Sequence, residues 1–241
     1  MYAVELDSVA VRYGNGALGV SDISFHVNEN QIVALFGPNG AGKTTSVRAL
    51  SGFMRTERVS VSHGTVHLLG KEVTGWEPHR TARLGLGYVP ERRKVFGNLS
   101  VADNFKASGG LPKGRAFDQA AERVLELFPA LRDRLGEQAG RLSGGQQQML
   151  AIARNMIRQP KVLVIDELTL GLHHSFHALL FDALSRIAAE GTSVVVVDES
   201  TGLALDVANY CYLIVGGKVR DSGPPEKFRG SELLVAGYVE A

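Results

Sequence analysis

The sequence predicts an α/β domain with a mainly helical segment inserted into it, and three observations support this fold class. Short apolar runs rich in β-branched residues, typical of buried strands, alternate with helical patterns. The glycine-rich stretch "GPNGAGKTT" stands between one such strand and a helix. Between about Ser100 and Arg158 the strand patterns give way to apolar residues at helical spacing. We therefore expect a single domain over residues 1–241, with a core of residues 1–87 and 159–241 and a helical subdomain at 88–158.

The composition is ordinary for a globular protein, and it excludes several classes. The 241 residues are 44% hydrophobic and 21% charged, and a net charge of +1 gives no reason to expect a nucleic-acid partner. The single cysteine, Cys211, excludes an intrachain disulfide and fits a reducing compartment. The start "MYAVELDSVAVRYG" is unlike a signal peptide, and "VLVI" and "VVVV" are too short to cross a bilayer. We expect a cytoplasmic chain that reaches a membrane only through other subunits.

The first third of the chain predicts strands and one helix. β-branched or alternating segments predict strands near Val4–Val11, Ile23–Val27 and Ile32–Phe36. A helix over Lys43–Leu50 follows the glycine-rich turn. The segments "GTVHLLG" and "GLGYVP" add two short strands.

The rest of the chain is first helical and then alternates again. The stretches "FDQAAERVLELF" and "QQQMLAIARNMI" have helical spacing, and the second predicts a core-facing side formed by Met149, Ile152, Ala153 and Met156. Helices are also predicted for "SFHALLFDALSRIAAE" and "TGLALDVA". Strands are expected at Val162–Ile165, Val194–Val197 and Tyr210–Val215.

The glycine-rich stretch fits the phosphate-binding pattern G-x-x-x-x-G-K-[ST] in the required strand–turn–helix setting. Its glycines let backbone N–H groups converge on phosphate oxygens at the positive end of a helix. Lys43 would reach the β- and γ-phosphates, and Thr44 would offer a hydroxyl to Mg²⁺. The residues expected to bind the nucleotide are Gly37, Pro38, Asn39, Gly40, Ala41, Gly42, Lys43, Thr44 and Thr45.

The stretch "VLVIDE" is a buried strand that carries two carboxylates at its end. Beside a phosphate loop, an aspartate in this position holds Mg²⁺, and the carboxylate after it can polarise the attacking water. We therefore expect Asp166 to be a metal ligand and Glu167 to be the catalytic base. The alternative is a strand end that merely faces solvent.

The stretch "LSGGQQQ" has two interpretations. Ser143, Gly144, Gly145 and Gln146 open a predicted helix and could form a helix cap with flexible glycines. They could also form a second phosphate nest from backbone donors and a serine hydroxyl. One nucleotide does not need two nests on one chain, whereas two chains placed head to tail would each use both.

The phosphate loop, "LSGGQ" and "VLVIDE", in this order and spacing, resemble the ATPase subunit of an ABC transporter over essentially the whole chain. The resemblance implies a phosphate-loop ABC ATPase domain with a β-subdomain and a helical subdomain, which binds ATP and Mg²⁺ at a dimer interface. It implies that Tyr13 in "VRYG" stacks on adenine. It also implies that Glu91 in "YVPE" stands where a metal-contacting glutamine is usual, and His173 where an aspartate is usual.

A narrower resemblance concerns the transported solute. The stretch "YVPERRKVFGNLSVADN" is similar to one in ATPases of branched-chain amino acid importers and their urea or amide relatives, and so is the ending "GYVEA". This resemblance implies a peripheral subunit on the cytoplasmic face of the inner membrane. Its implied partners are transmembrane permease subunits, a second ATPase subunit (a like or an unlike chain) and, indirectly, a periplasmic solute-binding protein.

The strand "SVVVVDEST" ends where this family places a switch residue that touches the γ-phosphate, and Glu199 holds that position. Histidine or glutamine could donate a hydrogen bond there, but ionised glutamate can only accept. Two unit charges about 4 Å apart repel by roughly 4 kcal/mol at an effective dielectric near 20. Glu199 therefore turns away to cap the next helix, is protonated, or weakens the site.

Two alternatives of function stay open at this point. The replacements at Glu199 and His173 would suit a non-catalytic regulatory cassette that binds ATP and gates its partner. A soluble ABC-type ATPase of repair or translation is the other alternative. Its usual long coiled coil or second cassette is missing, since only about a hundred residues separate the two halves of the site.

Overall fold

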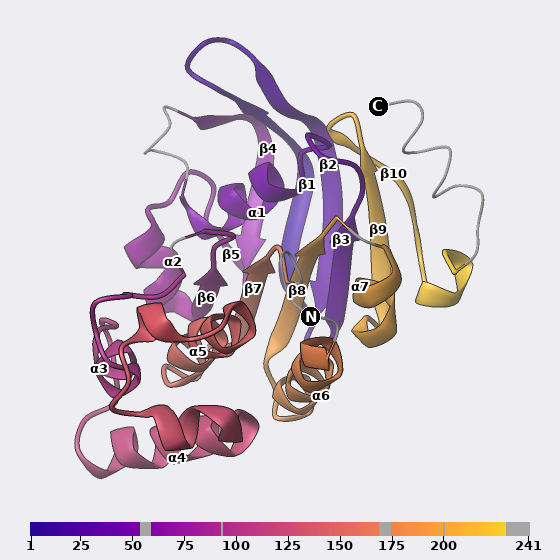
Figure 1. The fold of residues 1–241 in the computed structure, drawn as a ribbon. Coiled ribbons are helices and arrows are strands. Elements are labelled where there is room, and N and C mark those ends of the chain that lie inside the picture. The colour runs from indigo at the N-terminus through magenta and orange to yellow at the C-terminus, as the bar shows by residue number, and fades with distance from the viewer. Residues whose placement is uncertain (54–58, 93, 169–174, 200, 230–241) are drawn as a thin grey trace.

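The computed structural model describes residues 1–53, 59–92, 94–168, 175–199 and 201–229. Its strands form a ten-stranded mixed sheet in the order β5-β4-β1-β2-β10-β9-β3-β8-β7-β6 (Figure 1). The predicted α/β fold class is confirmed. Among the described residues, no helix combines the length and apolar character needed to span a bilayer.

One end of the sheet is antiparallel and contains β1 (Tyr2–Arg12), β2 (Leu18–Asn28), β4 (Ser60–Leu68) and β5 (Lys71–Glu72). The two N-terminal strands are longer than the sequence predicted, because ladder pairing extends past their apolar centres to polar ends. Strand β5 was not predicted, since its two charged residues have low strand propensity and pairing with β4 alone forms it.

The other end of the sheet is mostly parallel and positions the site. Strands β3 (Ile32–Phe36), β8 (Ser193–Asp198), β7 (Val162–Asp166) and β6 (Leu86–Val89) run parallel in that order. Every residue of β3, β7 and β8 is buried. The carboxyl ends of these strands lie at one edge, and the loops that follow them meet there.

Two further strands close the gap between the two ends of the sheet. Strand β9 (Tyr210–Val215) pairs in parallel with β3, and β10 (Lys218–Gly223) pairs antiparallel with β9. A single parallel pairing of Lys218 with Asp22 joins β10 to β2. The predicted strand at 210–215 is confirmed, whereas β10 was not predicted because its sequence is mostly polar and half-exposed.

Helices cover both faces of the sheet and create two apolar cores. Side chains of β3 alternate between them: Val33 and Leu35 face the core that contains α1 (Lys43–Ser51), and Ala34 and Phe36 face the other. That second core contains α6 (Ser175–Ala189) and α7 (Thr201–Val207). The short helix α2 (Pro78–Leu84) precedes β6.

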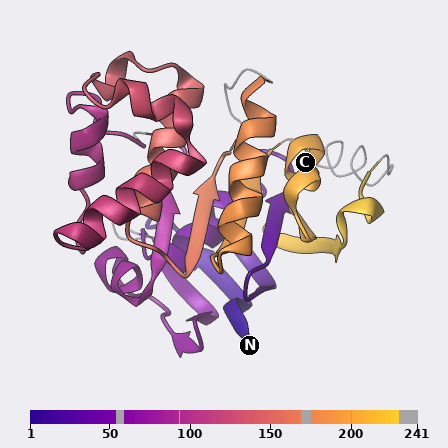
Figure 2. The ribbon, with the colours of Figure 1, turned by 90° about the horizontal axis from the view of Figure 1, so that it is seen from below.

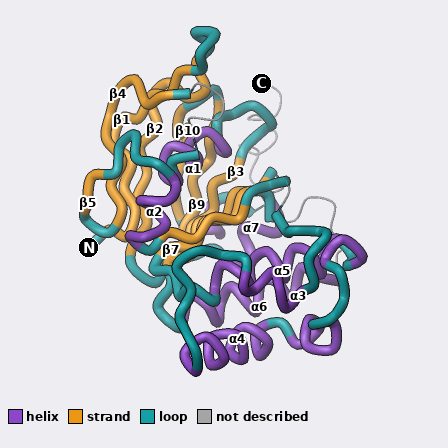
Figure 3. Tube along the Cα trace, turned by 90° about the vertical axis from the view of Figure 1, so that its left-hand side faces the viewer, coloured by secondary structure: helices purple, strands orange, loops and turns teal. Residues whose placement is uncertain are grey.

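The predicted helical segment is present and lies to one side of the strands, beside α6 (Figures 2 and 3). It consists of α3 (Val101–Lys106), α4 (Arg115–Leu127), short 3₁₀ turns at Pro129–Arg134 and Ala139–Arg141, and α5 (Gly144–Met156). The last two residues of strand β6 (Leu86–Val89) fall within the stretch predicted for the subdomain.

Helix α5 joins this segment to the sheet. The four residues predicted to face the core, Met149, Ile152, Ala153 and Met156, are all buried in the same apolar core as β7 and α6. The segment is therefore attached through a continuous apolar core, and the start of α5 is held in place relative to the sheet.

Candidate functional site

The phosphate loop connects β3 to α1, and glycine is required at both of its ends. A Cβ on Gly37 would lie 2.0 Å from the carbonyl oxygen of Ile214, and one on Gly42 would lie 2.4 Å from Val20. Gly42 also has a φ of +103°, which disfavours other residues. The loop can therefore pack against β2 and β9 only with these glycines, so that its backbone turns tightly into α1.

Lys43 is the first residue of α1, and its side chain folds back along the loop. Nζ donates to the carbonyl oxygens of Gly37 at 2.7 Å and Pro38 at 3.0 Å, and the residue is only 4% exposed. Burial lowers the pKa of Lys43, while nearby carboxylates, Glu167 first, oppose the shift. A buried cation in a glycine-rich loop at a helix N-terminus is suited to pair with phosphate oxygens.

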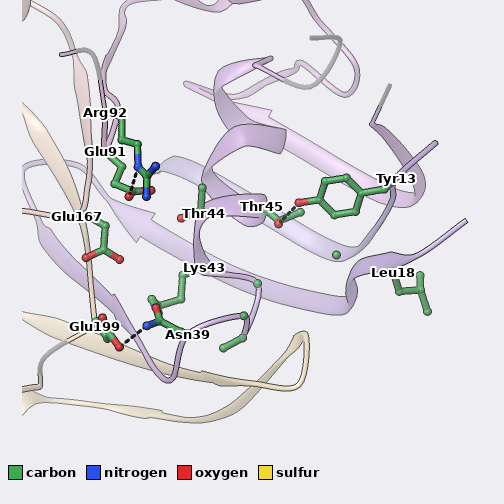
Figure 4. Close-up of a pocket in the computed structure, with 14 residues that line it drawn as sticks. Tyr13, Leu18, Asn39, Lys43, Thr44, Thr45, Glu91, Arg92, Glu167 and Glu199 are labelled. Carbon is green, nitrogen blue, oxygen red and sulfur yellow. Dashed lines mark hydrogen bonds and ion pairs between the residues drawn. The ribbon is translucent and has the colours of Figure 1, made fainter. Parts of the chain in front are cut away.

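The loop forms the floor of a pocket of about 500 Å³ (Figure 4). The pocket collects side chains from the strand ends and from the segment after β6. Its lining residues are Tyr13, Leu18, Gly19, Asn39, Gly40, Ala41, Gly42, Lys43, Thr44, Thr45, Glu91, Arg92, Glu167 and Glu199. Sequence positions more than 180 residues apart are thus brought together at one edge of the sheet.

The residues expected to hold a metal lie close to one another. The hydroxyl of Thr44 donates to Oδ1 of Asp166 at 2.9 Å, and Tyr88 donates to Oδ2 at 3.0 Å. Burial raises the pKa of Asp166, whereas these two hydrogen bonds lower it. Glu91 lines the pocket and pairs with Arg92 at 3.0 Å. One hydroxyl and two carboxylates are oxygen donors of the type that Mg²⁺ prefers, so these residues fit that ion.

Glu167 follows Asp166 and points into the pocket (Figure 4). It is 8% exposed and has a φ of +60°, an uncommon backbone conformation for a residue other than glycine. Burial raises the pKa of Glu167 to about 7, and Asp198 adds to the rise while Lys43 opposes it. A carboxylate with a pKa near neutrality is suited to accept a proton from water.

Glu199 faces the phosphate loop. Its Oε1 accepts a hydrogen bond of 2.5 Å from Nδ2 of Asn39, and both residues line the pocket. Glu199 is thus directed to the loop, and its role toward a bound γ-phosphate stays a prediction. The carboxylate lies on the same side as Lys43 and Glu167, so a bound triphosphate would meet a second acid here (Figure 4).

Tyr13 lines the opposite end of the pocket, beside Leu18 (Figure 4). Its hydroxyl shares a hydrogen bond of 2.9 Å with the hydroxyl of Thr45. The bond ties the end of β1 to α1 and leaves the ring at the mouth of the pocket. Its stacking on adenine stays a prediction.

The start of α5 is separate from this pocket, since none of its four residues is among the pocket's lining. Ser143 and Gly144 are exposed. The Ser143 side chain accepts from the backbone N–H of Gln146 at 3.3 Å, and the Gln146 side chain accepts from the backbone N–H of Ser143 at 3.0 Å. This capping box satisfies the helix end within the chain. The helix-cap interpretation is thus correct for the single chain, while binding of a partner's nucleotide stays a prediction.

Reasoning from the sequence missed two features of the site, the roles of Tyr88 and Arg92. Tyr88 was assigned only to a strand, but that strand, β6, pairs with β7, which carries Asp166. The signal that could have revealed the contact is the hydroxyl of a tyrosine near the end of a strand. Arg92 was given no role in the site, but it also lines the pocket. His173 lies outside the described residues.

The family follows from a family model described as ABC transporter, which matches residues 20–170. The chain belongs to the ABC transporter family. This family's cassettes bind and hydrolyse ATP, so the predicted membership and ATPase activity are confirmed at that level. The chain is the ATP-binding subunit of a transporter, and the prediction of a soluble ATPase of repair or translation is not supported.

Curated relatives carry several transport names. The chain is 33% identical to "High-affinity branched-chain amino acid transport ATP-binding protein BraG" of Pseudomonas aeruginosa, over 90% of each chain. It is 33% identical to "Probable branched-chain amino acid transport ATP-binding protein LivF" of Archaeoglobus fulgidus, over 84% of each. It is also 31% identical to "Lipopolysaccharide export system ATP-binding protein LptB" of Haemophilus influenzae, over 91% of this chain and 90% of that one.

Solved structures support the fold. The ADP conformation of MJ1267, an ATP-binding cassette of an ABC transporter, superposes with a TM-score of 0.85 at 20% identity over the whole of both chains. A dimeric post-hydrolysis state of the cassette MJ0796, bound to ADP and Pi, superposes with a TM-score of 0.80 at 20% identity, over 92% of this chain and 98% of that one.

Proposed function

We propose that the chain hydrolyses ATP to drive an importer of branched-chain amino acids or related small solutes. The observation that carries the proposal is the likeness to BraG and LivF over most of the chain, together with the "YVPERRKVF" stretch from Tyr88 to Phe96. In this proposal the chain attaches to permease subunits at the cytoplasmic face of the inner membrane. A periplasmic solute-binding protein would deliver the solute to the permease.

In this proposal, residues in and beside the pocket perform the steps of ATP hydrolysis. Lys43 and the loop N–H groups would hold the β- and γ-phosphates, and the ring of Tyr13 would stack on adenine. Thr44, Asp166 and Glu91 would hold Mg²⁺, which supplies positive charge to the phosphate oxygens when bound. Glu167 would accept the proton of the attacking water, which is consistent with a pKa of about 7.

The proposal also includes a second ATPase subunit. The start of α5 is exposed at Ser143 and Gly144 and does not reach the chain's own pocket. In a head-to-tail pair it would close the nucleotide site of the partner, with Ser143, Gly144, Gly145 and Gln146 as donors. The dimeric structure of the MJ0796 cassette, similar in fold, supports such a pair.

Lipopolysaccharide export is the second candidate, because relatives named LptB are 31% and 32% identical over most of the chain. Uptake of radiolabelled leucine separates the two candidates in cells that lack this chain. Import predicts that uptake is lost, that the wild-type chain restores it, and that the Glu167→Gln variant does not. Normal leucine uptake with lipopolysaccharide retained in the inner membrane would favour export instead.

A further inference from the structure

Tyr88 connects the edge of the sheet to the carboxylate of Asp166. It lies in β6 and pairs with Val164 of the neighbouring strand β7. Asp166 follows Val164 by two residues in β7. Its hydroxyl reaches Oδ2 of Asp166 at 3.0 Å, while Thr44 occupies Oδ1 at 2.9 Å. The two oxygens of one buried carboxylate therefore have separate partners, one from β6 and one from α1.

The ring of Tyr88 lies outside the lining of the nucleotide pocket. It packs against Phe53 with ring centroids 5.2 Å apart, and both rings line a groove of about 320 Å³ between α2, α5 and the end of α1. Strand pairing fixes the backbone and the ring contact restricts the side chain. The hydroxyl is consequently presented to Asp166 from a fixed direction.

A fixed donor matters because the terminal torsion of an aspartate is broad. Without a partner the carboxylate rotates between orientations of similar energy. The hydrogen bond from Tyr88 to Oδ2 selects one of them and leaves Oδ1 beside the hydroxyl of Thr44. Both candidate metal donors, Oδ1 and the Thr44 hydroxyl, then lie together, and Thr44 itself lines the pocket.

We propose that Tyr88 is a positioning residue that orients Asp166 for Mg²⁺ binding, an inference that rests on the metal site of the proposed function. Tyr88 does not touch the nucleotide pocket itself, since it is not among the residues that line it. Its effect passes through Asp166. Outer partners of metal ligands commonly change metal affinity by about 10–100-fold when they are removed.

The test is the affinity of the full chain for a fluorescent ATP analogue as free Mg²⁺ is raised from zero, in EDTA, to saturation. Tyr88→Phe keeps the ring and its contact with Phe53 and removes only the hydroxyl. We expect the half-saturating Mg²⁺ concentration to rise about 10-fold. The affinity measured in EDTA should stay unchanged, because no nucleotide contact is lost.

Tyr210→Phe is the matched control. It also removes a half-buried tyrosine hydroxyl, one that bonds to Ser222 and lies outside the pocket lining. We expect the Mg²⁺ dependence of this variant to equal that of the wild type. An unchanged Mg²⁺ midpoint in Tyr88→Phe, or an equal loss of affinity with and without Mg²⁺, would overturn the role of Tyr88.

Asp166→Asn separates failure of the inference from failure of the site. If Asp166 is a metal ligand, this variant loses most of the Mg²⁺ dependence that the wild type shows. If its Mg²⁺ dependence is that of the wild type, the metal assignment is wrong and the inference about Tyr88 falls with it. A large effect in Asp166→Asn without any in Tyr88→Phe would leave the metal site standing and reject only the positioning role.

Discussion

The phosphate-loop pocket and the start of α5 both place glycines and N–H groups at a helix N-terminus, but they differ in burial and in their partners. Lys43 and Glu167 in the pocket, and Asp166 beside it, are nearly buried and influence one another's charge. At the start of α5, Ser143 and Gly144 are exposed, and the capping box satisfies the helix end locally.

The difference shows which part of the site one chain completes. Buried charges are tolerated where partners are assembled around them, and the pocket contains a cation, a hydroxyl and several carboxylates that serve this purpose. The α5 start needs nothing further for the stability of its own chain. The role proposed for its exposed serine and glycine requires a second molecule that brings a phosphate to them.

The largest expected effect is the loss of Mg·ATP affinity in the Lys43→Ala variant. The loop would lose its positive charge, and the loss of charged hydrogen bonds worth about 3 kcal/mol lowers Mg·ATP affinity roughly 100-fold. Equilibrium titration of the single chain with a fluorescent ATP analogue measures this. Ser143→Ala is the control, and its affinity in the same assay should equal that of the wild type. Equal losses in both variants would mean that the two regions act on one nucleotide within one chain.

The second prediction is that Ser143→Ala lowers hydrolysis while leaving nucleotide affinity of the single chain intact. Removal of one donor to developing charge typically costs about 10²–10³ in rate. If the chain self-associates, a mixture of Lys43→Ala and Ser143→Ala chains should recover activity, because one composite site in the heterodimer is intact. Turnover of the mixture no higher than that of either variant alone would count against the head-to-tail pair.

The third prediction concerns the acid that faces the loop. Glu199→Gln is nearly isosteric, removes the repulsion and can donate a hydrogen bond, so turnover at saturating Mg·ATP should rise about 10-fold. Glu167→Gln in the same assay should abolish turnover. Turnover is measured alone and with the cognate partner. If Glu199→Gln changes neither turnover nor ATP affinity, the carboxylate does not face the γ-phosphate when ATP is bound.

The smallest expected effect is a change in the thermal stability of the Glu167→Gln variant. The pKa of Glu167 in the folded chain is about 7, above its ordinary value of 4.5, because burial and Asp198 disfavour the charge. The folded state therefore holds this proton more tightly than the unfolded state, and stability is lost as pH rises from about 4.5 through 7. Glu167→Gln removes this loss and should raise the Tm of the nucleotide-free chain at pH 8 by about 5 °C.

The same variant should change the Tm little at pH 5, where most of the stability is still present. Thermal unfolding in EDTA at both pH values tests this difference. Glu190→Gln, an exposed glutamate at the end of α6, is the matched control and should leave the Tm unchanged. A stabilisation of Glu167→Gln that is equal at pH 5 and pH 8 would show that charge is not its cause.

Much of the fold was predictable because its signals are local. The buried strands β3, β7 and β8 consist almost entirely of apolar and β-branched residues, and only a strand buried on both faces needs such a run. The strands β5 and β10 were missed because their residues are charged or polar, and they pair only because a neighbouring strand is already in place.

For the site, the sequence by itself determined which residues form the phosphate-binding loop and which strand carries Asp166 and Glu167. Each of these motifs is a short segment with its own backbone requirement. Tertiary structure alone decided that Tyr88 bonds to Asp166, 78 residues away, and that Asn39 bonds to Glu199, 160 residues away. Both contacts depend on strand order, which places β6 beside β7 and β3 beside β8. Strand order is set by packing of the two cores over the whole chain, so no local pattern of residues could reveal these partners.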